Sequence, residues 1–131
     1  MIARQNDDPQ QLTAADVLRK YKEEELPAFV GVPLENVNQV GNFGEGPLDV
    51  AAVRGNLDEI IALVDGGADL NARGELGNTA LHEAVSQGHL EAVKFLLNRG
   101  ASRSVKNDFG ETPLDLANLH GRKEIAHLLS H

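Results

Sequence analysis

One short motif recurs three times in this chain at a constant interval. Its copies begin 33 residues apart and read Gly-Pro-Leu-Asp at 46–49, Thr-Ala-Leu-His at 79–82 and Thr-Pro-Leu-Asp at 112–115. Glycines keep the same interval, two residues before each motif and nine residues after its start: Gly44, Gly77 and Gly110, then Gly55, Gly88 and Gly121. A fixed period of this length is typical of repeat proteins, in which each unit buries its apolar face against its neighbours. The chain is therefore predicted to form a stack of units that offers an extended surface.

Each unit has the pattern of a helix, a turn and a second helix. In the middle unit, Leu81 and Val85 mark a first helix that Gly88 ends, and Leu90 and Leu97 mark a second helix. The period of 33, the Thr-Pro-Leu-His-like opening, the alanine-bearing first helix and the Leu-Leu second helix together resemble the ankyrin repeat. The resemblance implies an all-α solenoid of three helix-turn-helix repeats with projecting β-hairpin-like loops and an N-terminal capping helix.

The chain divides into five segments on this interpretation. They are a flexible N-terminal arm at 1–12, a capping helix with a linker at 13–40, and repeats at 41–73, 74–106 and 107–131. The first 12 residues are polar and without a period. Thr13 and Asp16 form a weak capping box for a helix that runs toward Glu25 and stops before Pro27. Segment 13–40 is interpreted as a cap or as a decayed repeat.

The third repeat is predicted to close the stack. Three positions that are apolar in the first two repeats become polar there, at Asn118, Lys123 and Ser130. A further repeat would have to bury these groups at a cost in free energy, so we expect nothing to stack beyond them.

Composition narrows the classes of partner. Twelve basic and twenty acidic residues give a net charge of −8, which repels nucleic-acid backbones and anionic lipids and attracts a basic protein. An acidic balance also serves simply to keep a protein in solution. The chain has no cysteine and no apolar stretch long enough to span a bilayer, so a cytoplasmic location is expected, without membrane or direct nucleic-acid binding.

The resemblance implies binding of a protein partner through the loop tips and the ends of the first helices. The tip positions are Asn42, Phe43, Glu45, Glu75, Leu76, Asn78, Asp108, Phe109 and Glu111. The first-helix ends add Val53, Arg54, Ser86, Gln87, Leu119 and His120. Asp49 and Asp115 stand where the family usually has histidine, so the hydrogen bonds between adjacent loops are expected to differ at the two ends.

Three of these tip residues form what we call the apolar ladder: Phe43, Leu76 and Phe109, each one residue before a tip glycine. With the acidic residues around them, they are expected to be anchors for a basic protein. The alternative is that each packs on the neighbouring loop. The main hypothesis is a non-catalytic binding module, monomeric when free, that acts as an inhibitor or immunity protein covering a basic enzyme or toxin. A scaffold or adaptor and a self-associating protein are the alternatives.

Catalysis and cofactor binding have little support in the sequence. His82 and His89 occupy positions where the family has structural histidines, and no glycine cluster has a phosphate-binding spacing. The alternatives are a small enzyme with a site around His120 and His127 and a metal pair of His127 and His131 at i, i+4 spacing. We expect no catalytic residue, no metal and no cofactor.

Overall fold

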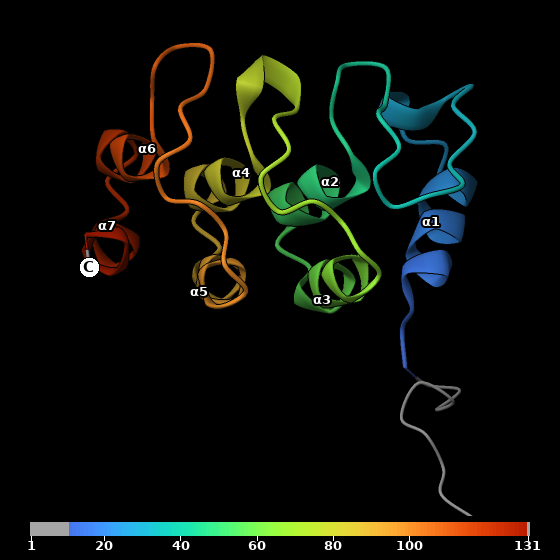
Figure 1. Ribbon diagram of the computed structural model, residues 1–131, viewed down its shortest axis with the longest axis horizontal. Helices are drawn as coiled ribbons and strands as arrows, with labels where there is room; N and C mark the ends of the chain where they lie inside the picture. Colours follow the sequence, from blue (N-terminus) through green and yellow to red (C-terminus); the bar gives the residue numbers. More distant parts are fainter. Residues whose placement is uncertain (1–10, 131) are drawn as a thin grey trace, which may run out of the picture.

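The computed structural model describes residues 11–130, in which seven α-helices and two short 3-10 helices lie along a single stack (Figure 1). The elements are α1 (Ala14–Glu23), η2 (Pro27–Phe29), α2 (Pro47–Arg54), α3 (Leu57–Asp65), η3 (Glu75–Gly77), α4 (Ala80–Gln87), α5 (Leu90–Asn98), α6 (Pro113–Leu119) and α7 (Lys123–Leu129). Within these described residues no β-strand occurs. The all-α repeat fold that the resemblance implies is confirmed, and projecting loops join the repeats (Figure 1).

The first helix of each repeat begins at the recurring motif. The hydroxyls of Thr79 and Thr112 accept hydrogen bonds from backbone N–H groups three residues on, which caps α4 and α6. Gly46 has no hydroxyl, but its own N–H donates to Asp49 Oδ2 at 2.9 Å. Gly55 and Gly88 then end α2 and α4 with φ of 70° and 79°, a left-handed conformation that glycine adopts without strain.

The helices form two rows. Figure 1 shows α2, α4 and α6 in one row, α3, α5 and α7 in a second, and the connecting loops projecting from the first row on the side away from the second. Leu81 and Val85 of α4 and Val93 and Leu96 of α5 are fully buried between the rows and between repeats. Because each helix hides its apolar side against its neighbours, at about 25 cal/mol for each Å² covered, the stack is stabilised mainly by contacts between elements.

Two side chains at the N-cap positions of α5 and α7 hydrogen-bond the preceding repeat. His89 Nε2 donates to the carbonyl oxygen of Val53 at 2.9 Å, and Arg122 Nη2 donates to the carbonyl oxygen of Ser86 at the same distance, 33 residues later. A Cβ at Gly55 would strike the His89 ring, and one at Gly88 would lie 2.9 Å from the Arg122 guanidinium. Each glycine thus makes room for the donor that follows it.

A second contact between repeats extends back into the linker. Asn71 Oδ1 accepts from Ser102 N at 2.8 Å, and Asn38 Oδ1 accepts from Asp69 N at 2.8 Å. The linker therefore contacts the first repeat as the first repeat contacts the second. This shared bond supports the interpretation of segment 13–40 as a decayed repeat, which stays a prediction.

The helix α1 lies across the N-terminal end of the two rows (Figure 1). Its Val17, Leu18 and Tyr21 are buried, and Tyr21 Oη donates to Glu59 Oε1 of α3 at 2.6 Å. Glu59 is 1% exposed and also accepts from Lys20, which holds α1 to the first repeat. The helix ends at Glu23, two residues earlier than the sequence suggested.

The opposite end of the stack carries the polar residues noted in the sequence. Asn118, Lys123 and Ser130 are all exposed. The proposed arm at 1–12 falls almost entirely outside the described residues, as does His131.

Candidate protein-interaction surface

Three tip loops, defined as residues 41–45, 74–78 and 107–111, are closed by the same backbone hydrogen bonds. In each, the first N–H donates to the last carbonyl, with distances of 2.7 Å from Gly41 to Glu45, 2.7 Å from Gly74 to Asn78 and 2.9 Å from Asn107 to Glu111. The fourth residue of each loop is a glycine with positive φ: Gly44, Gly77 and Gly110. The N–H of that glycine donates to the first carbonyl of the loop, which closes a two-residue turn whose second residue is the ladder position.

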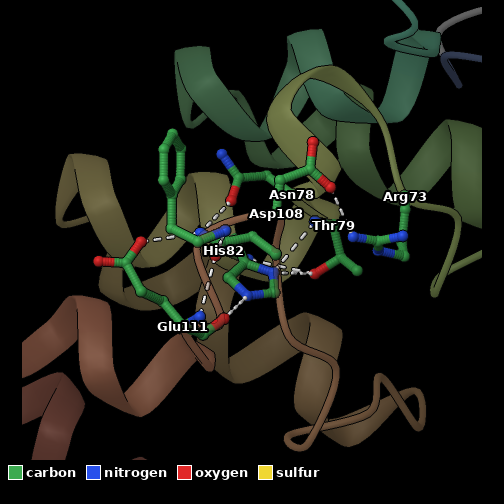
Figure 2. A network of polar contacts seen from close by, with 8 residues as sticks. Arg73, Asn78, Thr79, His82, Asp108 and Glu111 are labelled. Carbon is green, nitrogen blue, oxygen red and sulfur yellow. Dashed lines mark hydrogen bonds and ion pairs between the residues drawn. The ribbon is translucent and has the colours of Figure 1, made fainter.

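The second and third tip loops are joined through His82 (Figure 2). Its Nδ1 accepts from Thr79 N at 3.0 Å, so its Nε2 carries the proton and donates to the carbonyl oxygen of Glu111 at 2.9 Å. Burial lowers the pKa of His82, which favours this neutral form. Arg73, just before the second tip loop, adds an exposed ion pair at 2.8 Å with Asp108 of the third. The histidine is therefore structural, as the resemblance implied.

The first and third repeats lack this bond, because an aspartate replaces the histidine. Asp49 is only 8% exposed, and the one hydrogen bond to its carboxyl in the described residues comes from the N–H of Gly46, the N-cap of its own helix. Burial raises the pKa of Asp49 to about 7, and Glu83 and Glu45 add to the rise. Asp115 is exposed, and the bonds from Thr112 hold its pKa below the ordinary value. Two aspartates at equivalent positions thus have opposite environments.

The apolar ladder is exposed along its whole length. Phe43 is 56% exposed, Leu76 is 55% and Phe109 is 68%. Leu76 has φ of 57°, a left-handed conformation that costs a non-glycine residue about 1–2 kcal/mol. Its carbonyl oxygen accepts from Asp108 N at 3.0 Å, so the strained residue also holds the next tip loop. The neighbouring loops leave more than half of each ladder residue accessible.

Other predicted positions are partly engaged within the chain. Asn42 Nδ2 donates to the carbonyl oxygens of Pro27 and Val30 at 3.0 and 2.9 Å, which fixes the first tip loop to the linker. Arg54 pairs with Glu24 at 3.0 Å and lies over the Tyr21 ring. The remaining first-helix ends are exposed at Val53, Gln87, Leu119 and His120 and partly buried at Ser86.

Four of the predicted residues meet in one groove between the linker and the first two repeats, which we call the acidic groove. It has a volume of about 270 Å³ and is lined by Leu26, Pro27, Ala28, Glu45, Asp49, Val50, Val53, Arg54, Glu75 and Glu83. The sequence had not singled out Val50 or Glu83 as site residues. Val50 lies three residues before Val53, and Glu83 lies three residues before Ser86. Each therefore shares a helix face with a predicted residue, and this spacing could have identified both.

Burial also raises the pKa of Glu83, and the charges of Glu75 and Glu45 raise it further. The groove therefore brings together partly desolvated carboxyls that oppose one another's ionisation, and a cation placed among them would favour their charged forms. Among residues 11–130, no group of three or more His, Asp or Glu side chains is arranged to hold a metal ion.

A family model described as ankyrin repeats (3 copies) matches the chain over residues 17–107 and again over residues 48–131. The chain belongs to the ankyrin-repeat family. Ankyrin repeats are protein–protein interaction modules, so binding of a protein partner follows from membership. A search of curated proteins finds no match to this ankyrin-repeat chain. No helix in the described part of the chain is long and apolar enough to cross a membrane.

Proposed function

We propose that this ankyrin-repeat protein is a non-catalytic module that grips one basic protein with its tip loops and first-helix ends. The observation that carries the proposal is the exposed apolar ladder of Phe43, Leu76 and Phe109, flanked by carboxylates. Isolated exposed apolar residues are ordinary, but an aligned row at loop ends with acidic neighbours fits a binding surface. The strained backbone at Leu76 supports the same proposal, since strain persists where function favours it.

The proposed biological role is inhibition. A partner covered by the tip loops would be a basic enzyme or toxin whose active site the module blocks, as an immunity protein does. The net charge of −8 would speed association with such a partner. Burial of the apolar ladder in the complex would slow dissociation. The proposed setting is the cytoplasm, in keeping with a chain that has no cysteine.

The test compares affinity capture by the wild-type chain and by a variant with Phe43, Leu76 and Phe109 all changed to serine. A matched control changes Val30 and Val40 to serine, because these are equally exposed apolar residues outside the tip loops. A one-to-one basic partner retained by the wild type and the control, and lost by the ladder variant, is expected. If the partner is an enzyme, its activity should fall on binding. A partner that the ladder variant captures equally well would refute the proposal.

Binding kinetics separate the contribution of the net charge from that of the apolar ladder. Added salt should lower the association rate, whereas Phe109→Ala should raise the dissociation rate by roughly 30-fold or more, the effect of a hot-spot residue. An effect of Phe109→Ala on association alone would contradict an anchoring role.

Self-association is the second candidate, because an exposed apolar row can pair with its copy across a two-fold axis. Light scattering distinguishes a self-associating protein from an inhibitor that is monomeric when free. A monomer over the micromolar range is expected for the inhibitor, and a dimer abolished by the ladder variant would favour self-association.

A further inference from the structure

The acidic groove has two kinds of wall. Leu26, Pro27, Val50 and Val53 supply apolar surface, and carboxyl groups from four separate elements line the rest. These carboxylates belong to Glu45 of the first tip loop, Asp49 of α2, Glu75 of the second tip loop and Glu83 of α4. A side chain that combines an apolar stem with a cationic head would match both walls.

The carboxyl groups of the groove have no cationic partner in the part of the chain that the structure describes: none of the four forms an ion pair within residues 11–130. Arg54 lines the groove, but its guanidinium pairs with Glu24, lies 3.9 Å from Glu59 and stacks 5.0 Å from the centre of the Tyr21 ring. It is therefore committed to the capping helix.

Asp49 is the most deeply buried of the four carboxyl residues in the acidic groove. The residue is 8% exposed, its Oδ2 accepts from the N–H of Gly46, and its Oδ1 has no hydrogen-bond donor among the described residues but is not fully buried, so a group in the groove can reach it. At the equivalent place in the second repeat, His82 has both ring nitrogens bonded. Burial of a carboxyl without compensating donors is unfavourable, so a donor supplied from outside would stabilise it.

We propose that the acidic groove receives an arginine side chain from the protein partner, with the stem against Val50 and Val53 and the guanidinium among Glu75, Glu83 and Asp49. Arginine is favoured over lysine because its five donors point in several directions, as acceptors on separate elements require. This inference rests on the proposed function for its biological meaning. The groove itself is tested without the partner.

The probe is acetyl-arginine amide, titrated into the ¹⁵N-labelled protein at slightly alkaline pH and followed by amide chemical shifts. Its neutral isostere, acetyl-citrulline amide, controls for shape. Saturable shifts at Val50, Val53 and Glu83 are expected with the arginine compound, and binding at least tenfold weaker with the citrulline compound. Equal shifts from both compounds, or shifts confined to other helices, would overturn the proposal. Equal affinity for acetyl-lysine amide would overturn the choice of arginine.

Variants of the groove provide the second measurement. The double change Glu75→Gln and Glu83→Gln should weaken binding of acetyl-arginine amide at least tenfold, after circular dichroism has shown that the helices are intact. Glu91→Gln, an exposed carboxylate on α5, should leave it unchanged. Unaltered binding to the double variant would overturn the proposal. A failed titration leaves the apolar ladder and its capture experiment standing, and a failed capture leaves the titration standing, so the two proposals fail separately.

Discussion

Replacing Asp49 with asparagine should make the protein more stable, and more so as the pH rises. The carboxyl is 8% exposed, and burial raises its pKa from the ordinary 3.8 to about 7. A raised pKa means that the folded state holds the proton more tightly than the unfolded state. The stabilising contribution of the protonated carboxyl is fully present below about pH 4 and is lost as the pH rises through about 7.

The size of the effect follows from the same shift. Each factor of ten in proton affinity is worth about 1.4 kcal/mol, so the ionised Asp49 destabilises the folded state by up to about 4 kcal/mol. Asparagine can still accept the Gly46 N–H and never ionises. The variant should therefore match the wild type near pH 4 and exceed its free energy of unfolding by up to about 4 kcal/mol above pH 7.

The assay is urea unfolding followed by circular dichroism at a series of pH values from about 4 to about 8. His82 titrates in both proteins, so its opposing contribution cancels in the difference between them. A difference that stays constant with pH, or that favours the wild type above pH 7, would refute the reasoning.

The equivalent aspartate of the third repeat is the matched control. Asp115 is exposed, and the backbone N–H of Thr112 holds its pKa below the ordinary value. A lowered pKa contributes stability above the unfolded pKa and loses it as the pH falls. Asp115→Asn should thus be less stable than the wild type at neutral pH, and the two should converge in acid, opposite to the result at Asp49.

Four further substitutions, one of them a control, test the packing and backbone arguments by urea unfolding. Tyr21→Phe leaves the buried Glu59 without its 2.6 Å donor and should cost about 1–3 kcal/mol, and an unchanged free energy of unfolding would mean that water replaces the hydroxyl. Leu76→Asn should gain about 1 kcal/mol by relieving the left-handed backbone, and a loss would show that the leucine side chain packs in the free protein. Gly55→Ala should cost roughly 2–3 kcal/mol, because the new Cβ meets the imidazole of the next repeat. Gly121→Ala, with similar φ and open space before it, should cost less than Gly55→Ala, and equal costs would remove the steric argument.

The helices and their ends could be predicted because local signals repeat. The period of 33, the threonine caps and the glycines at helix ends specify six of the helices almost without tertiary information. The capping helix was predicted from Thr13 and an apolar face, but its end was placed two residues late. Glu25 adopts φ of 53°, and nothing in its side chain signals that conformation.

The acidic groove could not be predicted in the same way. One wall comes from Leu26 to Ala28, in a linker that has no period, so its position depends on how the chain turns back along the first repeat. The ladder positions were predicted from their place before the tip glycines, and their exposure is observed. The left-handed backbone of Leu76 was not predicted, because the adjacent Gly77 already accounts for the turn by sequence criteria.

Gly55 and Gly88, which end α2 and α4, each contact a hydrogen-bond donor from the next repeat, so each junction depends on residues from two successive repeats. Gly55 admits an imidazole and Gly88 admits a guanidinium, and the Arg122 Nε is buried without a hydrogen-bond partner in the described part of the chain. The two junctions therefore share a geometry but differ in chemistry, so repeats are not freely interchangeable units. A shuffled or duplicated repeat would keep the fold only where the incoming donor fits the glycine before it, and exchange of single repeats must carry both members of a junction together.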